Sequence, residues 1–178
     1  MSVTINGSGT ISGITSGGLG SSPIITQPEL VSGVAGTGPA FSAYQSSLQT
    51  ISSNTVTKVQ FQTKEFDTAN CFDNVTNYRF TPNVAGYYQI VGCTYFNTSL
   101  TTGEIYTTLY KNGASFKTLS DWSASTAQLY TMNGSCIVYA NGSTDYFEIY
   151  IYQNTGSSKV MYAGNTAVYF QAFLARSA

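Results

Sequence analysis

The stretch Tyr146-Phe147-Glu148-Ile149-Tyr150-Ile151-Tyr152 decides the fold class, because its side chains alternate between two kinds of surface. Residues two apart on a β-strand share a face, so Phe147, Ile149 and Ile151 form one apolar side that predicts contact with a core. The other side carries the three tyrosines and Glu148. It is too aromatic for free solvent, while its carboxylate and phenols are unsuited to a dry core. This side favours a subunit interface or a ligand platform.

The last predicted strand, residues 167–175, is two-sided in the same way. Its apolar face consists of Val168, Phe170, Ala172 and Leu174. Phe173 projects from the opposite side, where it is a further candidate for a subunit interface. Both strands therefore predict a sheet with one face in a core.

Frequent turn signals separate the predicted strands. Asn-Gly pairs stand at Asn112-Gly113, Asn133-Gly134 and Asn141-Gly142, and this dipeptide favours the two-residue turns of hairpins. Alternating patterns predict further strands near residues 58–62, 88–92 and 105–109. Short strands between frequent turns are typical of an antiparallel sandwich or jelly roll, so we predict an all-β domain over residues 39–178.

The composition supports a folded β-protein and limits its partners. Charged residues make up 8% of the 178 residues, against roughly a quarter in average proteins. The 14 Tyr and 10 Phe argue against disorder. The net charge of −1 and the lack of a basic run argue against nucleic acid as a partner. The Tyr excess fits either ordinary β-propensity or subunit interfaces, and the sequence leaves both open.

Residues 1–38 differ from the rest, since they hold 9 of the 17 glycines and one charged residue, Glu29. They cannot form a core, and we expect an attachment arm that orders against a partner. A short helix is compatible with the capping-box spacing of Thr26 and Glu29. The arm carries aliphatic residues that a plain linker does not need: Val3, Ile5, Ile11, Ile14 and Leu19.

Neither a signal peptide nor a membrane span is expected. The first ten residues lack a positive and an apolar region, and no stretch approaches the roughly 18 apolar residues of a span. We therefore expect no membrane insertion. Cys71, Cys93 and Cys136 lack metal-type spacing, and in a protein made and kept in a cytoplasm they are expected as free thiols.

The segment from Phe80 to Ile90 follows the pattern Phe-x5-Gly-x-Tyr-x-apolar. On the basis of this motif, residues 39–178 resemble the globular head of complement subcomponent q, within the tumour-necrosis-factor-like jelly-roll superfamily. Further matches are Phe66-Asp67, Tyr78, Lys111-Asn112-Gly113, and residues 138–149 and 170–174. The resemblance implies an antiparallel jelly-roll sandwich that forms a homotrimer around an apolar, aromatic axis. Candidate trimer contacts are then Tyr146, Tyr150, Tyr152 and Phe173.

The chain also departs from that family. The family's Gly-Asp pair is loosened to Gly142-Ser143-Thr144-Asp145, and Ala172 replaces a glycine near the end. The calcium binding of the family is therefore not carried over, and no cofactor or metal is expected. The Gly/Ser/Thr-rich arm resembles the N-terminal segments of tailed-phage fibre and decoration proteins.

Catalytic motifs are absent from the sequence. Without His there is no Ser-His-Asp or Cys-His nucleophile and no His-based zinc site. Asp67 and Asp73 are the nearest candidates for a glycosidase carboxylate pair, but we interpret them as solvated loop acids. Trp122, the one tryptophan, is a candidate for stacking on a sugar ring, although an interface or rim anchor is the more common role. We predict no enzyme.

The leading hypothesis is a bacteriophage virion structural protein, assembled in the host cytoplasm. Residues 1–38 would bind other virion proteins, and residues 39–178 would form a trimeric surface knob that contacts host surface glycans weakly. Head decoration and a short fibre remain open as its place on the particle. The alternatives are a tail-fibre receptor-binding adhesin and a free lectin-like binding module.

Overall fold

The computed structural model describes residues 38–100, 102–125 and 127–178. The predicted attachment arm, with Val3, Ile5, Ile11, Ile14 and Leu19, lies outside this part of the chain, as does the predicted short helix. No helix in the described part is long and apolar enough to cross a membrane.

The described residues form thirteen strands, and every pairing between them is antiparallel, so the all-β prediction is confirmed. One sheet has the order β10 (Thr131–Ala140), β7 (Gly86–Tyr95), β13 (Tyr169–Ser177), β1 (Ala40–Tyr44), β4 (Thr63–Asp67). A second has the order β5 (Phe72–Asp73), β6 (Arg79–Phe80), β11 (Phe147–Gln153), β8 (Gly103–Lys111), β9 (Ala114–Ala124). β3 (Thr57–Lys58) also pairs with β11, and β12 (Lys159–Met161) pairs with β2 (Gln49–Ile51).

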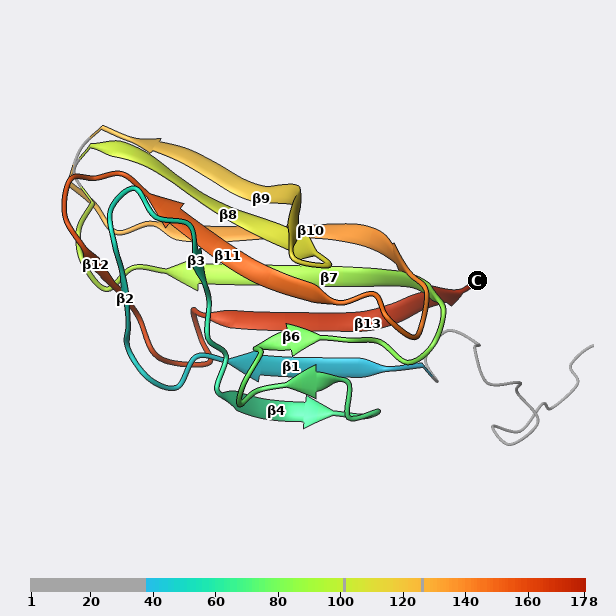
Figure 1. Cartoon of the computed structure of the whole chain (residues 1–178). Coiled ribbons are helices and arrows are strands. Elements are labelled where there is room, and N and C mark those ends of the chain that lie inside the picture. Colours follow the sequence, from blue (N-terminus) through green and yellow to red (C-terminus); the bar gives the residue numbers. More distant parts are fainter. Residues whose placement is uncertain (1–37, 101, 126) are drawn as a thin grey trace, which may run out of the picture. The chain divides into compact units, whose positions relative to one another are not determined.

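The two larger sheets pack face to face as a sandwich (Figure 1). The alternation predicted for residues 146–152 is confirmed, because Phe147, Ile149 and Ile151 are fully buried in β11. The apolar face predicted for the last strand is buried as well. Aromatic rings fill one part of the core, where the Phe41 and Phe72 centroids lie 4.6 Å apart.

The hairpin predicted at Asn112-Gly113 is confirmed. These two residues join β8 to β9, and both have a positive φ, 54° at Asn112 and 79° at Gly113, as a type I′ turn requires. The Asn112 amide then donates to the Asp145 carboxylate at 2.8 Å, and its oxygen accepts from the Tyr146 N–H at 2.9 Å. The turn is thereby tied to the loop that precedes β11.

The turn predicted at Asn133-Gly134 is wrong, because both residues lie inside β10. Gly134 pairs with Gly92 on β7, and the β9 residue Leu119 lies against both. A Cβ atom at Gly134 would overlap the Leu119 carbonyl oxygen. The glycine is therefore needed for a close approach between the sheets and not for a reversal of the chain.

The strand predicted near residues 58–62 is shorter than expected, since β3 ends at Lys58. Val59 and Phe61 are nevertheless fully buried, as the alternation predicts. The Val59 N–H donates to the Ile149 carbonyl at 2.9 Å, after which the ladder stops. The pattern located the core residues correctly, whereas the extent of the ladder depends on the neighbouring strand.

The strand directions define two ends of the sandwich. β1 starts beside the end of β13, because Ala40 pairs with Phe173 and Tyr44 with Tyr169. The chain thus enters the sandwich at the end where Ala178 lies. β9 finishes at the opposite end, beside the start of β8 and the loop into β10 (Figure 1).

Candidate functional site

The five-stranded sheet exposes large apolar side chains on its outward face. Phe173 on β13 is 51% exposed and Ile137 on β10 is 57% exposed. The pairing places Ile137 opposite Gln89, and Gln89 opposite Phe173, so the three lie in one row across the strands. We call this surface the apolar face and define it by six residues: Phe66, Tyr87, Val91, Ile137, Tyr139 and Phe173.

The middle of the apolar face is free of charge. The outward residues on the central part of β7 and β13 are Tyr87, Gln89, Val91, Gln171 and Phe173. The Tyr87 and Tyr139 rings lie 5.6 Å apart on neighbouring strands. Charged side chains stand at the borders, with Glu65 on β4 accepting from the Ser42 hydroxyl and Arg176 near the end of β13. At the other border, Lys111 and Lys117 donate to the carbonyls of Tyr139 and Ile137 on β10. A surface of this kind loses little hydration energy when another apolar surface covers it.

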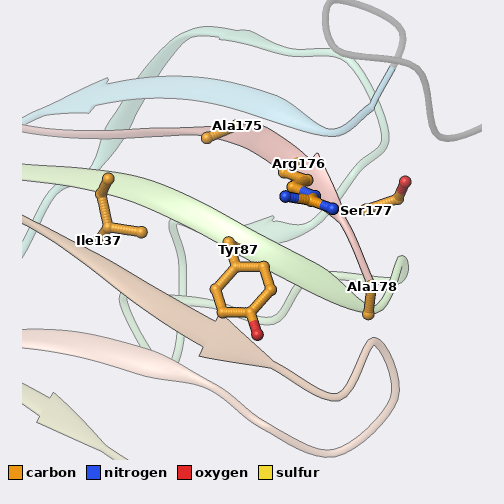
Figure 2. A pocket seen from close by; sticks show the side chains of 6 residues that line it. All are labelled: Tyr87, Ile137, Ala175, Arg176, Ser177 and Ala178. Atoms are coloured by element: carbon orange, nitrogen blue, oxygen red, sulfur yellow. The ribbon is translucent and has the colours of Figure 1, made fainter.

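Two hollows interrupt the apolar face. A cavity of ≈ 620 Å³ lies between Tyr87, Ile137 and the end of β13, as Figure 2 shows, and Arg176 stands at its border. A smaller cavity of ≈ 220 Å³ lies between Phe66 and Phe173, with Val91 in its wall. The face is therefore uneven and offers recesses to the side chains of a partner.

The outward face of the six-stranded sheet carries tyrosines in stacked pairs. The Tyr110 and Tyr150 rings have centroids 3.9 Å apart, and those of Tyr106 and Tyr152 are 4.7 Å apart. We call these four residues and Tyr146 the tyrosine row. Each of the five is half-buried on the single subunit, because its ring is partly covered by neighbours from the same chain.

An ion pair neutralises the charge beneath the tyrosine row. Glu148 on β11 is buried, and its carboxylate lies 2.6 Å from the Lys58 ammonium of β3. Burial alone lowers the pKa of Lys58, but the hydrogen bond and the charge of Glu148 outweigh it, so the pKa stands above its ordinary value. The carboxylate that the sequence placed among the tyrosines is thus neutralised within the subunit.

The structure divides the four predicted trimer contacts between two surfaces. Tyr146, Tyr150 and Tyr152 lie on the outward face of the six-stranded sheet, whereas Phe173 lies on the apolar face of the other sheet. Sequence reasoning missed the other members of the apolar face. The pair Tyr87-Tyr88 was the available signal, because with Tyr88 in the core its neighbour has to point outward.

Trp122 is 54% exposed and lies near the end of β9, at the end of the sandwich opposite to Ala178. It pairs with Ile105, and its ring lies 6.1 Å from that of Tyr130, which is buried. The ring is held on one side and open to solvent on the other. This geometry suits either of the two roles expected for it, contact with a sugar or contact with another protein.

The interpretation as a solvated loop acid is wrong for Asp67, which ends β4 and has a nearly buried side chain, whereas Asp73 is half-buried. Asp67 accepts from the N–H groups of Cys71 at 2.9 Å and Phe72 at 3.0 Å, and its side chain is nearly buried. Asp73 accepts from three N–H groups of the turn that follows it. Both carboxylates therefore accept hydrogen bonds from backbone N–H groups, and this gives both residues a structural role.

The three cysteines are free thiols in the structure, as predicted. Cys71 and Cys93 are buried and Cys136 is half-buried, and burial raises the pKa of all three thiols. In the described part of the chain, no group of three or more Cys, Asp or Glu side chains is placed to hold a metal ion.

No protein-family model matches the chain, and no curated protein matches it. Solved structures do. The globular domain of zebrafish complement 1qA protein has 18% identity and a TM-score of 0.57, and the match covers 79% of this chain and 99% of that one. Eiger TNF from S. frugiperda has 10% identity and a TM-score of 0.59, with 79% and 95% covered. Murine APRIL at pH 5.0 has 8% identity and a TM-score of 0.56, with 76% and 97% covered.

At these identities the likeness concerns the fold. The described domain is an antiparallel two-sheet sandwich similar to those of the complement head and the tumour-necrosis-factor-like proteins. The resemblance found in the sequence is thereby confirmed at the level of the fold. The comparisons give no information on the predicted phage particle.

Proposed function

We propose that this protein is a non-enzymatic surface module that assembles as a homotrimer through its apolar face. The observation that carries the proposal is the combination of exposed Phe66, Ile137 and Phe173 with a charge-free middle of the sheet. An apolar patch of this kind marks an interaction surface on a soluble protein. Three copies follow from the resemblance to complement heads, which assemble around an apolar, aromatic axis.

The setting that we propose is the particle of a tailed bacteriophage. Residues 1–38 would attach the module to other virion proteins, and the sandwich would point away from the particle. The position of the described chain supports this arrangement. The chain enters the sandwich at the Ala178 end, so that Trp122 lies at the far end, where a receptor or glycan would be met.

The assembly is tested by introducing a charge into the apolar face. Phe173→Glu should convert the trimer to a monomer at micromolar concentration, because three carboxylates would become buried without partners. Phe116→Glu is the matched control, since Phe116 is 46% exposed but lies on β9 of the other sheet. Sedimentation of both variants and of the unchanged protein decides the matter. An unchanged protein that sediments as a monomer contradicts the proposal.

The attachment role is tested by deleting residues 1–38. The truncated protein should keep the trimer but should no longer appear on purified particles. Incorporation at the normal level would show that the arm is not the anchor. Copy number on intact particles separates head decoration, with hundreds of copies, from a short fibre, with few.

A second candidate function is a receptor-binding adhesin or a free lectin-like module, and the exposed Trp122 ring favours it. Stacking of an aromatic ring on a sugar would be lost in Trp122→Ala. A glycan array with both proteins tests this function. Glycan binding together with absence from purified particles supports the free module, whereas glycan binding by a protein present on particles supports the adhesin.

A further inference from the structure

A polar cavity of ≈ 500 Å³ opens beside β5 and β6, at one end of the tyrosine row, and nothing in the proposed assembly uses it. Its wall includes Lys64, Asn70, Asp73 and Arg79. It lies between β5 and β6 of the six-stranded sheet and Lys64 on β4, the edge strand of the five-stranded sheet.

Arg79 is the cation in this wall that makes no ion pair, although Asp73 lies opposite it on the neighbouring strand. Lys64 lies 3.2 Å from the Asp67 carboxylate, and Asp73 is held by the N–H groups of its own turn. No ion pair within 4 Å in the described part of the chain involves Arg79. Its guanidinium lies 4.5 Å from the centre of the Tyr146 ring, which fixes its plane. A fixed guanidinium is a ready partner for a carboxylate.

The backbone around Arg79 is held in an unusual conformation. Tyr78, the preceding residue, has a φ of 50°, which is uncommon for a bulky side chain. Asn70, in the cavity wall, has a φ of 52°. The Asp73 carboxylate accepts from the N–H groups of Val75, Thr76 and Asn77 and thereby supports the turn that leads into Tyr78. The turn that precedes Arg79 is therefore held by hydrogen bonds of its own.

The tyrosine row begins beside the cavity and continues along the outward face of the six-stranded sheet. From Tyr146 to Tyr152 the strand rises six residues, or about 20 Å. The stacked pairs Tyr110–Tyr150 and Tyr106–Tyr152 present ring edges and phenol groups along this length. Lys58 and Glu148 neutralise each other beneath the row. The surface thus has a guanidinium without an ion pair at one end and an aromatic, hydroxyl-bearing continuation.

We propose that this surface binds a carboxylate-bearing glycan, with the acid on Arg79 and the sugar rings along the tyrosine row. A pyranose has apolar C–H faces and hydroxyl edges, which match aromatic rings and phenols. A nucleic acid would need cations along its whole backbone, whereas on this surface Lys58 and Lys64 are paired with carboxylates and Arg79 stands alone as a cation without an ion pair. An apolar peptide would leave the polar cavity and its guanidinium without partners.

The binding of galacturonate oligomers, measured by calorimetry on the full chain, tests the proposal. The acidic hexamer should bind, whereas its methyl ester and neutral dextran oligomers should bind at least about tenfold more weakly, the difference expected for a hydrogen-bonded charge. Arg79→Gln should weaken the acidic hexamer to the same degree. Lys159→Gln is the matched control, because it removes one positive charge from the small β2–β12 sheet.

Oligomer length tests the role of the tyrosine row. Tyr106→Leu changes the end that is far from Arg79, so it should weaken the hexamer about threefold or more and leave the dimer unchanged. No binding of the acidic hexamer at millimolar concentration overturns the proposal. So does equal binding of the methyl ester, tighter binding of oligothymidylate, or binding that Arg79→Gln leaves intact.

This inference adds a ligand class to the proposed surface module. Sedimentation of the same samples separates the two claims. If Arg79→Gln loses the glycan and keeps the trimer, the sites are independent. If the unchanged protein is a monomer that still binds the acidic hexamer, the assembly proposal fails and the glycan site stands.

Discussion

Asp145 joins two loops at the Ala178 end of the sandwich. Its carboxylate accepts from the Asn112 amide at 2.8 Å and the Asn141 N–H at 3.0 Å, and it lies 2.9 Å from the Lys111 ammonium. Burial alone raises the pKa of Asp145, but these donors outweigh it and hold the pKa below its ordinary value. Asp145 therefore joins the β8–β9 hairpin to the loop before β11, in addition to the contacts between Asn112 and Tyr146.

Replacing this carboxylate should be costly. Asp145→Ala removes a buried acceptor that the Asn112 amide, the Asn141 N–H and the Lys111 ammonium share, so the free energy of unfolding should fall by about 1–3 kcal/mol. Asp121→Ala, at an exposed position on β9, should change it by less than about 0.5 kcal/mol. Urea denaturation measures both values. Equal effects of the two substitutions would show that the Asp145 contacts do not contribute.

Asp73 predicts how stability changes in acid. The N–H groups of Thr76 and Val75, with Asn77, lower the pKa of Asp73 from 3.8 to about 2. A lowered pKa in the folded state stabilises the fold above the unfolded value, and this stabilisation is lost as the pH falls towards 2. The free energy of unfolding should therefore decrease between pH 4 and pH 2. In Asp73→Asn the decrease should be smaller, and an identical pH profile would contradict this account.

Gly134 and Gly156 are needed for different reasons: Gly134 because another strand lies too close for a side chain, and Gly156 because its backbone has a positive φ. Gly134→Ala would place a methyl group against the Leu119 carbonyl and should destabilise the fold by about 1–3 kcal/mol. Gly156→Ala has open space around the new methyl and a φ of 87°, so its cost of about 1 kcal/mol comes from the backbone alone. Thermal unfolding of both variants measures which substitution destabilises the fold more. A Gly134→Ala protein as stable as Gly156→Ala would mean that β9 can move away.

At the scale of the element, a polar contact joins the two sheets. The hydroxyls of Thr94 on β7 and Thr107 on β8 lie 2.8 Å apart, and both residues are buried. Changing either one to Val leaves a buried hydroxyl without a partner, at about 1–3 kcal/mol. The double change should cost less than the sum of the single changes. A double-mutant cycle by urea denaturation measures this difference, and strict additivity would contradict it.

Sequence patterns correctly predicted those structural features that are determined by residues close together in the sequence. The alternation in β11, the buried side of β13 and the Asn112-Gly113 turn require no knowledge of distant residues. The role of Gly134 and the early end of β3 depend on neighbouring strands, so they could not be predicted from their own sequence. The same holds for the candidate site. That Phe173 shares a face with Ile137 follows from the strand order, which the sequence does not contain.

At the scale of the whole molecule, assembly makes stability depend on concentration. A trimer that dissociates on unfolding gains stability by mass action, so its Tm should rise as the protein is concentrated from 1 to 100 μM. The Phe173→Glu protein should show no such rise in Tm, because the unfolding of a monomer involves no dissociation. Scanning calorimetry of both proteins checks this. A constant Tm for the unchanged protein would count against assembly through the apolar face.

The position of β1 has a mechanical consequence. Because β1 enters at the Ala178 end and pairs with β13 and β4 on its two sides, a tether at Gly38 and a load at Trp122 would pull along the strands. The ladder bonds of β1 would then resist together, in shear. A pull between Gly38 and Ala178 would open the same ladder one bond at a time. The domain should therefore resist a pull between Gly38 and Trp122 better than a pull between Gly38 and Ala178.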